Sequence, residues 1–154
     1  MTAPASPDAA PATAPDLFQR WCEVADAVRA TTKRLEKSAA LEAYFPTLPD
    51  DALATAARFF SGLPFPRHDQ RTTSVGGAAV GEALASVTGT SRDALRERTV
   101  AVGDLGDVAR LVLEERAAGA PPPSGLTLDA IATAFGELAA TRGAHAKRER
   151  VQAL

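Results

Sequence analysis

The chain has 154 residues and a formal net charge of −2 at pH 7, enough for one ordinary domain with a hydrophobic core but hardly for two. Apolar residues form 45% of the sequence and aromatic residues only 5%, with alanine supplying much of the apolar share, which favours close helix packing over a strand-rich core. One cysteine excludes an internal disulfide and a Cys-based structural zinc site, and no stretch approaches the roughly 20 apolar residues of a membrane span. We expect an all-α, soluble, cytoplasmic protein without a metal site.

The first residues differ in composition from the rest of the chain. Residues 1–15 are mostly Ala, Pro, Thr, Ser and Asp, which predicts a flexible tail. They lack the basic start and the continuous apolar run of a secretion signal. We therefore expect a disordered Ala/Pro-rich tail over residues 1–15, followed by one helical domain over residues 16–154.

Apolar residues at three-to-four spacing predict three helices in the first part of this domain. Proline, glycine and capping residues mark where each helix begins and ends. The expected helices run from Asp16 to Ala30, from a cap at Thr31 or Thr32 to Pro46, and from Pro49 to Gly62.

A loop rich in proline and threonine, residues 63–74, separates these helices from the next group. Its length exceeds that of a simple turn, and long loops in compact domains are often functional. Further helices are expected from the glycines of residues 75–77 to Gly89, from a Ser91 cap, from the turn at residues 103–106 to Gly119, from a Thr127 cap and from Ala144. The composition of residues 120–125 predicts a short, stiff connector.

The segment Gly103-Asp104-Leu105-Gly106-Asp107-Val108-Ala109 places two glycines around the start of an apolar helix. A helix start leaves several backbone N–H groups without intrahelical partners and carries a partial positive charge, so it can hold a phosphate oxygen. Glycine keeps the approach open, while Asp104 as N-cap satisfies first-turn donors on one side. A capped helix after a tight turn is the alternative interpretation.

Basic residues gather in two places although the whole chain is slightly acidic. Residues 29–37 contain four basic residues against one acid, and residues 142–150 contain four against one. Like-charge runs are usually solvated helix faces, and binding to an anionic partner is the second interpretation of each cluster.

Catalytic patterns are scarce. His68, Asp69 and Ser74 could form part of a nucleophilic site of a small hydrolase, but neighbouring residues in a proline-containing loop rarely point at one another. His145 is expected to face solvent or a phosphate. The sequence has no phosphate-binding loop with its lysine and hydroxyl and no dinucleotide fingerprint after a strand, which favours a binding protein.

Four segments occur in the same order as in a known family. They are Thr32-Lys33-Arg34-Leu35-Glu36-Lys37, Ser61-Gly62-Leu63-Pro64-Phe65-Pro66, Val75-Gly76-Gly77 and the segment at residues 103–109. This set resembles the N-terminal DNA-binding domain of ATP-dependent DNA ligases from about Phe18 to the C-terminus, including residues 126–128 and the approach to the last helix at residues 142–148. The ordered set carries the resemblance, because none of the segments is specific alone.

The resemblance implies a multi-helix bundle that lies across the minor groove opposite a nick and holds the backbone through helix N-termini and basic side chains. Main-chain phosphate contacts are independent of base sequence and need less positive charge than an Arg-rich surface, so a net charge of −2 does not exclude them. The implied DNA-binding residues are Thr32, Arg34, Lys37, Gly76, Gly77, Gly103, Asp104, Leu105, Gly106, Arg142, Lys147 and Arg148.

The sequence also departs from a complete ligase. The family's adenylated lysine lies in a Lys-x-Asp-Gly motif of a separate nucleotidyltransferase domain, followed by an OB domain, and none of Lys33, Lys37 and Lys147 is in such a motif. The chain is therefore expected to have no catalytic residue and no cofactor of its own, with ATP and Mg²⁺ required only by a catalytic domain elsewhere. In the family the domain continues by a helix or more, so a shortened C-terminus is expected here.

The resulting hypothesis is a module that binds duplex or nicked DNA without sequence specificity and positions it for nucleotidyltransferase and OB domains supplied in cis or in trans. Such a module would serve DNA replication, repair or recombination. A helical protein-interaction or structural module without DNA binding is the main alternative, and it predicts that the basic clusters and the glycine turns lie on different faces or beneath other helices.

Overall fold

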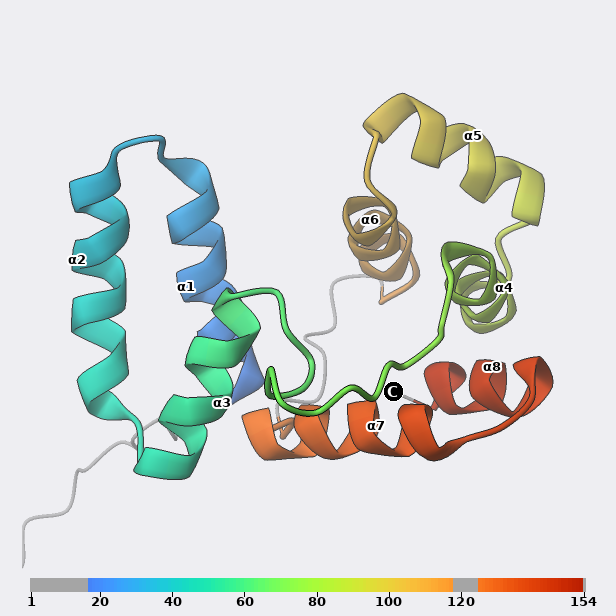
Figure 1. Cartoon of the computed structure of the whole chain (residues 1–154). Coiled ribbons are helices and arrows are strands. Elements are labelled where there is room, and N and C mark those ends of the chain that lie inside the picture. The colour runs from blue at the N-terminus through green and yellow to red at the C-terminus, as the bar shows by residue number, and fades with distance from the viewer. Residues whose placement is uncertain (1–16, 118–124, 154) are drawn as a thin grey trace, which may run out of the picture.

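A computed structural model of the chain describes residues 17–117 and 125–153, and within these ranges it is helical throughout apart from turns, loops and one isolated bridge between Leu17 and Thr127 (Figure 1). The predicted all-α fold is confirmed. The elements are α1 (Phe18–Ala30), α2 (Arg34–Tyr44), the 3₁₀ turn η1 (Phe45–Thr47), α3 (Asp50–Phe60), α4 (Gly77–Thr88), α5 (Arg92–Val102), α6 (Leu105–Ala117), α7 (Leu128–Ala140) and α8 (Ala144–Gln152). The predicted tail, the Gly119 helix end and most of the proline connector lie outside the described residues.

Several helix ends are where local chemistry predicted them. The side chain of Ser91 accepts a hydrogen bond from the Ala94 N–H at the start of α5, and that of Thr127 accepts one from the Ala130 N–H at the start of α7. Gly103 ends α5 in the left-handed region at φ 86°, a conformation that glycine adopts without steric cost.

The predicted threonine cap of α2 is wrong. Lys33 occupies the N-cap position, and α2 has no side-chain cap. The Thr31 Oγ1 accepts from the Lys33 N–H at 3.1 Å and donates to Glu36 at 2.5 Å, so this hydroxyl stabilises the turn before the helix rather than the helix start. Thr32 is exposed.

Helices α1, α2, α3 and the start of α7 enclose a first apolar core. Its buried members are Val24, Tyr44, Leu48, Ala56 and Leu128, and aromatic rings of α1 and α3 pack around them. The indole N–H of Trp21 donates to the Ala56 carbonyl at 3.3 Å, which ties α1 to α3. The Phe18 N–H donates to the Leu126 carbonyl at 2.8 Å, so the approach to α7 is fixed against the start of α1.

Helices α4, α5 and α6 enclose a second core around Leu84, Leu95, Val108 and Val112. In Figure 1, α1–α3 and α4–α6 form two lobes on opposite sides, with α7 and α8 running beneath them and the loop at residues 61–76 connecting them. Helix α8 packs against α4, and α7 packs against α3. Between α1 and α6 lies an open cleft lined by Asp26, Arg29, Ala30, Arg110 and Glu114. No helix in the described ranges has the length and apolar character needed to cross a membrane.

Candidate nucleic-acid interface

The two glycine-rich helix starts lie next to each other. Gly76 is the N-cap residue of α4, Gly77 is its first residue, and α6 begins at Leu105. A Cβ atom placed on Gly77 would lie 4.0 Å from Leu105 Cδ2, so the Leu105 side chain at the start of α6 lies beside the first residue of α4. Gly76, Gly77, Gly103, Asp104 and Gly106 are all exposed, and Leu105 is half-buried. Both predicted backbone-binding turns are therefore accessible on the same lobe.

The start of α6 has the geometry predicted for a capped but open helix end. Asp104 Oδ1 accepts from the Asp107 N–H at 2.8 Å, which confirms the cap, and the Val108 N–H donates to the Asp104 carbonyl at 3.2 Å. The N–H groups of Leu105 and Gly106 have no hydrogen-bond acceptor among the described residues. A Cβ on Gly106 would approach Asp104 Oδ1 to 3.0 Å, so glycine keeps both the cap and the open donors in place.

One ion pair connects this helix start to the other lobe. Arg29 Nη1, in the last turn of α1, lies 3.2 Å from Asp107 Oδ2. The hydrogen bond to Asp107 is also the main reason that the pKa of Arg29 is raised. Because the α1–α2 turn follows Arg29 directly in the chain, the pair holds the first basic cluster on the side of the molecule where α6 begins.

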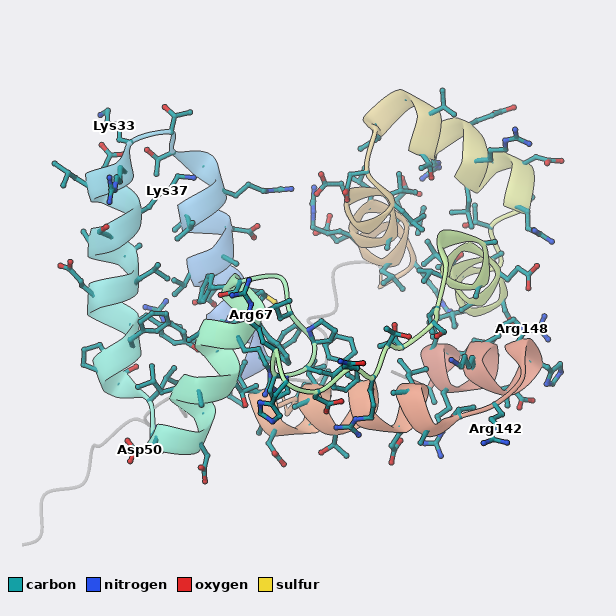
Figure 2. The ribbon with its side chains drawn as sticks, viewed as in Figure 1. Lys33, Lys37, Asp50, Arg67, Arg142 and Arg148 are labelled. Carbon is teal, nitrogen blue, oxygen red and sulfur yellow. The ribbon has the colours of Figure 1, made fainter. Side chains whose placement is uncertain are left out.

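The α1–α2 tip carries the first group of predicted contact residues. Figure 2 shows Lys33 and Lys37 at this end of the α1–α2 hairpin. Lys33 is paired with Glu36 at 2.7 Å, whereas Arg34 is exposed and has no ion-pair partner among the described residues. Leu35, which follows Arg34 in the chain, is 84% exposed. The tip therefore presents at least one free guanidinium to a partner.

The remaining predicted contact residues, Arg142, Lys147 and Arg148, lie on the α7–α8 side, and two of them bind other parts of the protein. Lys147 Nζ donates to the Thr73 carbonyl at 2.6 Å, and Arg148 Nη1 lies 3.2 Å from Glu82 Oε2 on α4. These contacts attach α8 to the connecting loop and to α4. Arg142 is exposed, and Figure 2 shows Arg142 and Arg148 at the opposite end of the molecule from Lys33 and Lys37. Contact of this group with DNA remains a prediction.

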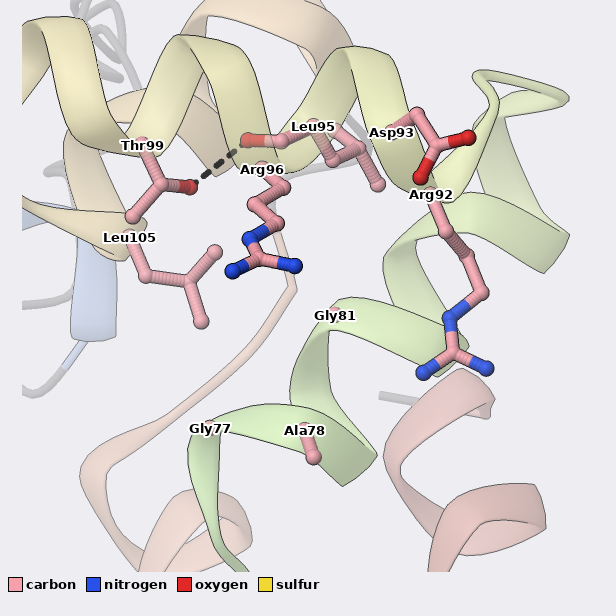
Figure 3. A pocket seen from close by; sticks show the side chains of 9 residues that line it. All are labelled: Gly77, Ala78, Gly81, Arg92, Asp93, Leu95, Arg96, Thr99 and Leu105. Carbon is pink, nitrogen blue, oxygen red and sulfur yellow. Dashed lines mark hydrogen bonds between the residues drawn. The ribbon is translucent and has the colours of Figure 1, made fainter.

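A cleft of about 740 Å³ opens beside the glycine helix starts, between α4, α5 and the first residue of α6 (Figure 3). Its lining includes Gly77, Leu105 and two arginines of α5, Arg92 and Arg96. Neither arginine was among the contact residues predicted from the sequence. Their spacing of four residues places both on one face of a helix, which is the signal that could have identified them.

The alternative hydrolase site is not formed. The Asp69 carboxylate binds Arg71 through its backbone N–H at 3.0 Å and its guanidinium at 2.6 Å, and Ser74 Oγ lies 2.9 Å from Thr72 Oγ1. Burial, with Asp26 and Glu23 nearby, raises the pKa of the Cys22 thiol and keeps it protonated. No cluster of metal-ligating side chains occurs in the part of the chain that the structure describes.

The Asp69–Arg71 contact gives a pH-dependence that can be measured. Hydrogen bonds from Arg71 lower the pKa of Asp69 from 3.8 to about 2. The carboxylate therefore stabilises the fold fully above pH 3.8, and this stabilisation is lost as the pH falls through about 2. A carboxyl ¹³C titration should give a midpoint near 2 in the wild type and a clearly higher one in Arg71→Ala, shifted toward the ordinary value of about 3.9, because the variant loses the guanidinium but keeps the backbone N–H that also binds the carboxylate. Equal midpoints in both proteins would contradict the assignment.

The fold and this arrangement define a class: an all-α module with exposed glycine helix starts and, among its described residues, no cluster of metal-ligating side chains. The family described as DNA ligase N terminus matches residues 17–154, and the chain belongs to this family.

Similar proteins are ligases by name. The chain is 39% identical to a probable DNA ligase of Opitutus terrae over 108 residues, which is 70% of this chain and 11% of that protein. It is 33% identical to a probable DNA ligase of Koribacter versatilis over 139 residues, 89% of this chain and 23% of that protein. It is 28% identical to a DNA ligase of Methanocella arvoryzae over 138 residues, 88% of this chain and 24% of that protein. The chain thus spans about a tenth to a quarter of the length of these relatives.

Proposed function

We propose that the chain is the DNA-binding module of an ATP-dependent DNA ligase and holds duplex or nicked DNA, without sequence specificity, for a catalytic domain. The adjacent, exposed helix starts of α4 and α6 carry this proposal. Their backbone N–H groups can bind phosphate oxygens of any sequence, as a protein that must accept any nick requires.

The charge distribution supports the same function. The chain has a net charge of −2, yet Arg34 at the α1–α2 tip has no ion-pair partner among the described residues. Main-chain donors supply part of the attraction to phosphate, so a few well-placed cations suffice. The Arg29–Asp107 pair links the end of α1, next to the tip, to the start of α6, which supports treating both as parts of one interface.

The chemical step of sealing belongs to other domains in this proposal. Lys33, Lys37 and Lys147 are the three lysines of the sequence, and none begins a Lys-x-Asp-Gly motif. ATP and Mg²⁺ would act on the nucleotidyltransferase domain, together with an OB domain, while this module positions the DNA. Sealing of nicks in replication, repair or recombination would be the process it serves.

Replacing Arg34 with alanine tests the proposal. We expect weaker duplex binding by a similar factor for unrelated sequences and a salt dependence of log K that is flatter by about one unit, because one phosphate contact is lost. Fluorescence anisotropy with two unrelated nicked duplexes over a range of salt concentrations measures both quantities.

Arg20→Ala is the matched control for Arg34→Ala. Arg20 is exposed and pairs with Glu23 on α1, so its removal should leave affinity and salt dependence unchanged. A wild-type protein without salt-dependent duplex binding would favour the protein-interaction alternative instead.

A further inference from the structure

The cleft between α4 and α5 has a floor that offers close access to the main chain. Gly77, Ala78 and Gly81 line it from α4, and none of the three has a side chain beyond Cβ. A Cβ placed on Gly81 would meet no atom within 4 Å, so this part of the floor is open space. A ligand group entering the cleft can therefore reach the α4 backbone without displacing a side chain.

Arg96 is the free cation of this cleft. Its side chain is exposed and makes no ion pair or hydrogen bond with any described residue. Figure 3 shows its guanidinium extending from α5 into the space above Gly77 and Gly81. Arg92 enters one turn earlier and is held by Glu82 at 3.0 Å. Asp93 also lines the cleft, and Figure 3 shows its side chain at the start of α5, beside Arg92.

These features favour a phosphate group over other ligands. A guanidinium presents a planar set of N–H donors that matches two oxygens of a phosphate, and such charge-assisted pairs are strong and directional. The small residues on the opposite wall leave room for the sugars that flank a phosphodiester. Gly77 and Leu105 belong both to the lining of the cleft and to the helix starts of α4 and α6. A DNA strand lying along these two helix starts would therefore pass the mouth of the cleft.

We propose that the cleft between α4 and α5 binds one backbone phosphate of the DNA, with Arg96 as its ligand and Arg92 as an accessory cation. The proposal rests on the DNA-binding function proposed above. It extends the interface from the α4 and α6 starts to the inner face of α5, a helix that the sequence did not assign to DNA binding.

Arg96→Ala and Arg98→Ala form a matched pair that tests the proposal. The two residues lie on the same helix, but Arg98 is paired with Glu115 at 2.8 Å on α6 and does not line the cleft. We expect Arg96→Ala to bind nicked duplex about fivefold or more weakly, with a salt dependence of log K flatter by about one unit. Arg98→Ala should match the wild type, and Arg96→Lys should keep the salt dependence but lose part of the affinity because the planar donor set is gone.

The possible outcomes separate this proposal from the proposed function. If the wild type binds duplex and Arg34→Ala weakens it but Arg96→Ala does not, the phosphate site is wrong and the DNA-binding function stands. If the wild type does not bind duplex, both are overturned.

A second measurement follows the Arg96 Nε–H signal by NMR with millimolar inorganic phosphate. A shift of this signal together with unchanged duplex binding by Arg96→Ala would identify a free-phosphate site and overturn the assignment to DNA. Circular dichroism should be unchanged in all variants, and the melting temperature should be unchanged in the Arg34 and Arg96 variants, since these two side chains are exposed and unpaired.

Discussion

Leu128→Ala is expected to lower the free energy of unfolding by about 2–5 kcal/mol, the usual cost of removing a fully buried leucine side chain. Leu128 is 0% exposed and is the residue through which the start of α7 enters the first core. Its loss leaves a cavity among Val24, Tyr44 and Ala56 and loosens the attachment of α7 to α1–α3. Urea unfolding followed by circular dichroism measures the effect.

Leu35→Ala is the control for this measurement. The same side chain is removed, but Leu35 is 84% exposed on α2, so its loss should change stability by no more than about 0.5 kcal/mol. A cost for Leu128→Ala as small as that for Leu35→Ala would show that α7 is not part of the first core.

Gly106→Val is expected to weaken duplex binding about tenfold or more while leaving the helix content nearly unchanged. The Cβ atom alone would approach Asp104 Oδ1 to 3.0 Å, and the branched side chain would cover the N–H groups at the start of α6. The loss of hydrogen bonds to a charged phosphate, at about 1.5–3 kcal/mol each, sets this magnitude. Duplex titration at fixed salt, with circular dichroism of the same samples, measures both properties.

Two further variants separate loss of the binding surface from loss of the cap. Gly136→Val places the same residue in α7, where a Cβ would lie at an ordinary 4.0 Å from Arg71 Nη1, and should bind like the wild type. Asp104→Ala removes the cap hydrogen bond to Asp107 and should cost about 0.5–2 kcal/mol of stability. Unfolding of Gly106→Val, rather than weaker binding by a folded protein, would favour a purely structural role for this glycine.

The fold could be predicted from the sequence to the extent that local chemistry determines it. Ser91 and Thr127 supply caps, and Gly89 and Gly103 end helices in the left-handed region, because these effects act within one turn of the chain. The cap of α2 was predicted wrongly because two local arrangements compete. The Thr31 hydroxyl could cap the helix start or stabilise the turn before it, and its hydrogen bonds with Glu36 and the Lys33 N–H favour the turn.

The site depended more on tertiary contacts, which the sequence does not specify. The adjacency of Gly77 and Leu105 exists only because α4 and α6 share one core. Lys147 and Arg148 were predicted to contact DNA, which stays a prediction. The sequence could not show that they also bind Thr73 and Glu82, because these contacts form only when α8 packs on α4. The cleft that Arg92 and Arg96 line could not be predicted, because its opposite wall comes from α4 and depends on how α4 packs beside α5.

The separate cores of the two lobes have a mechanical consequence. Across the α1–α6 cleft the lobes meet through charged side chains, among them exposed Arg29 paired with half-buried Asp107, and the two buried apolar cores have no residue in common. Exposed ion pairs contribute little to rigidity, so the span between the α1–α2 tip and the α6 start is compliant. If the module binds DNA as proposed, this compliance would let it follow duplexes whose groove width varies with sequence or at a strand break, without unfolding either lobe.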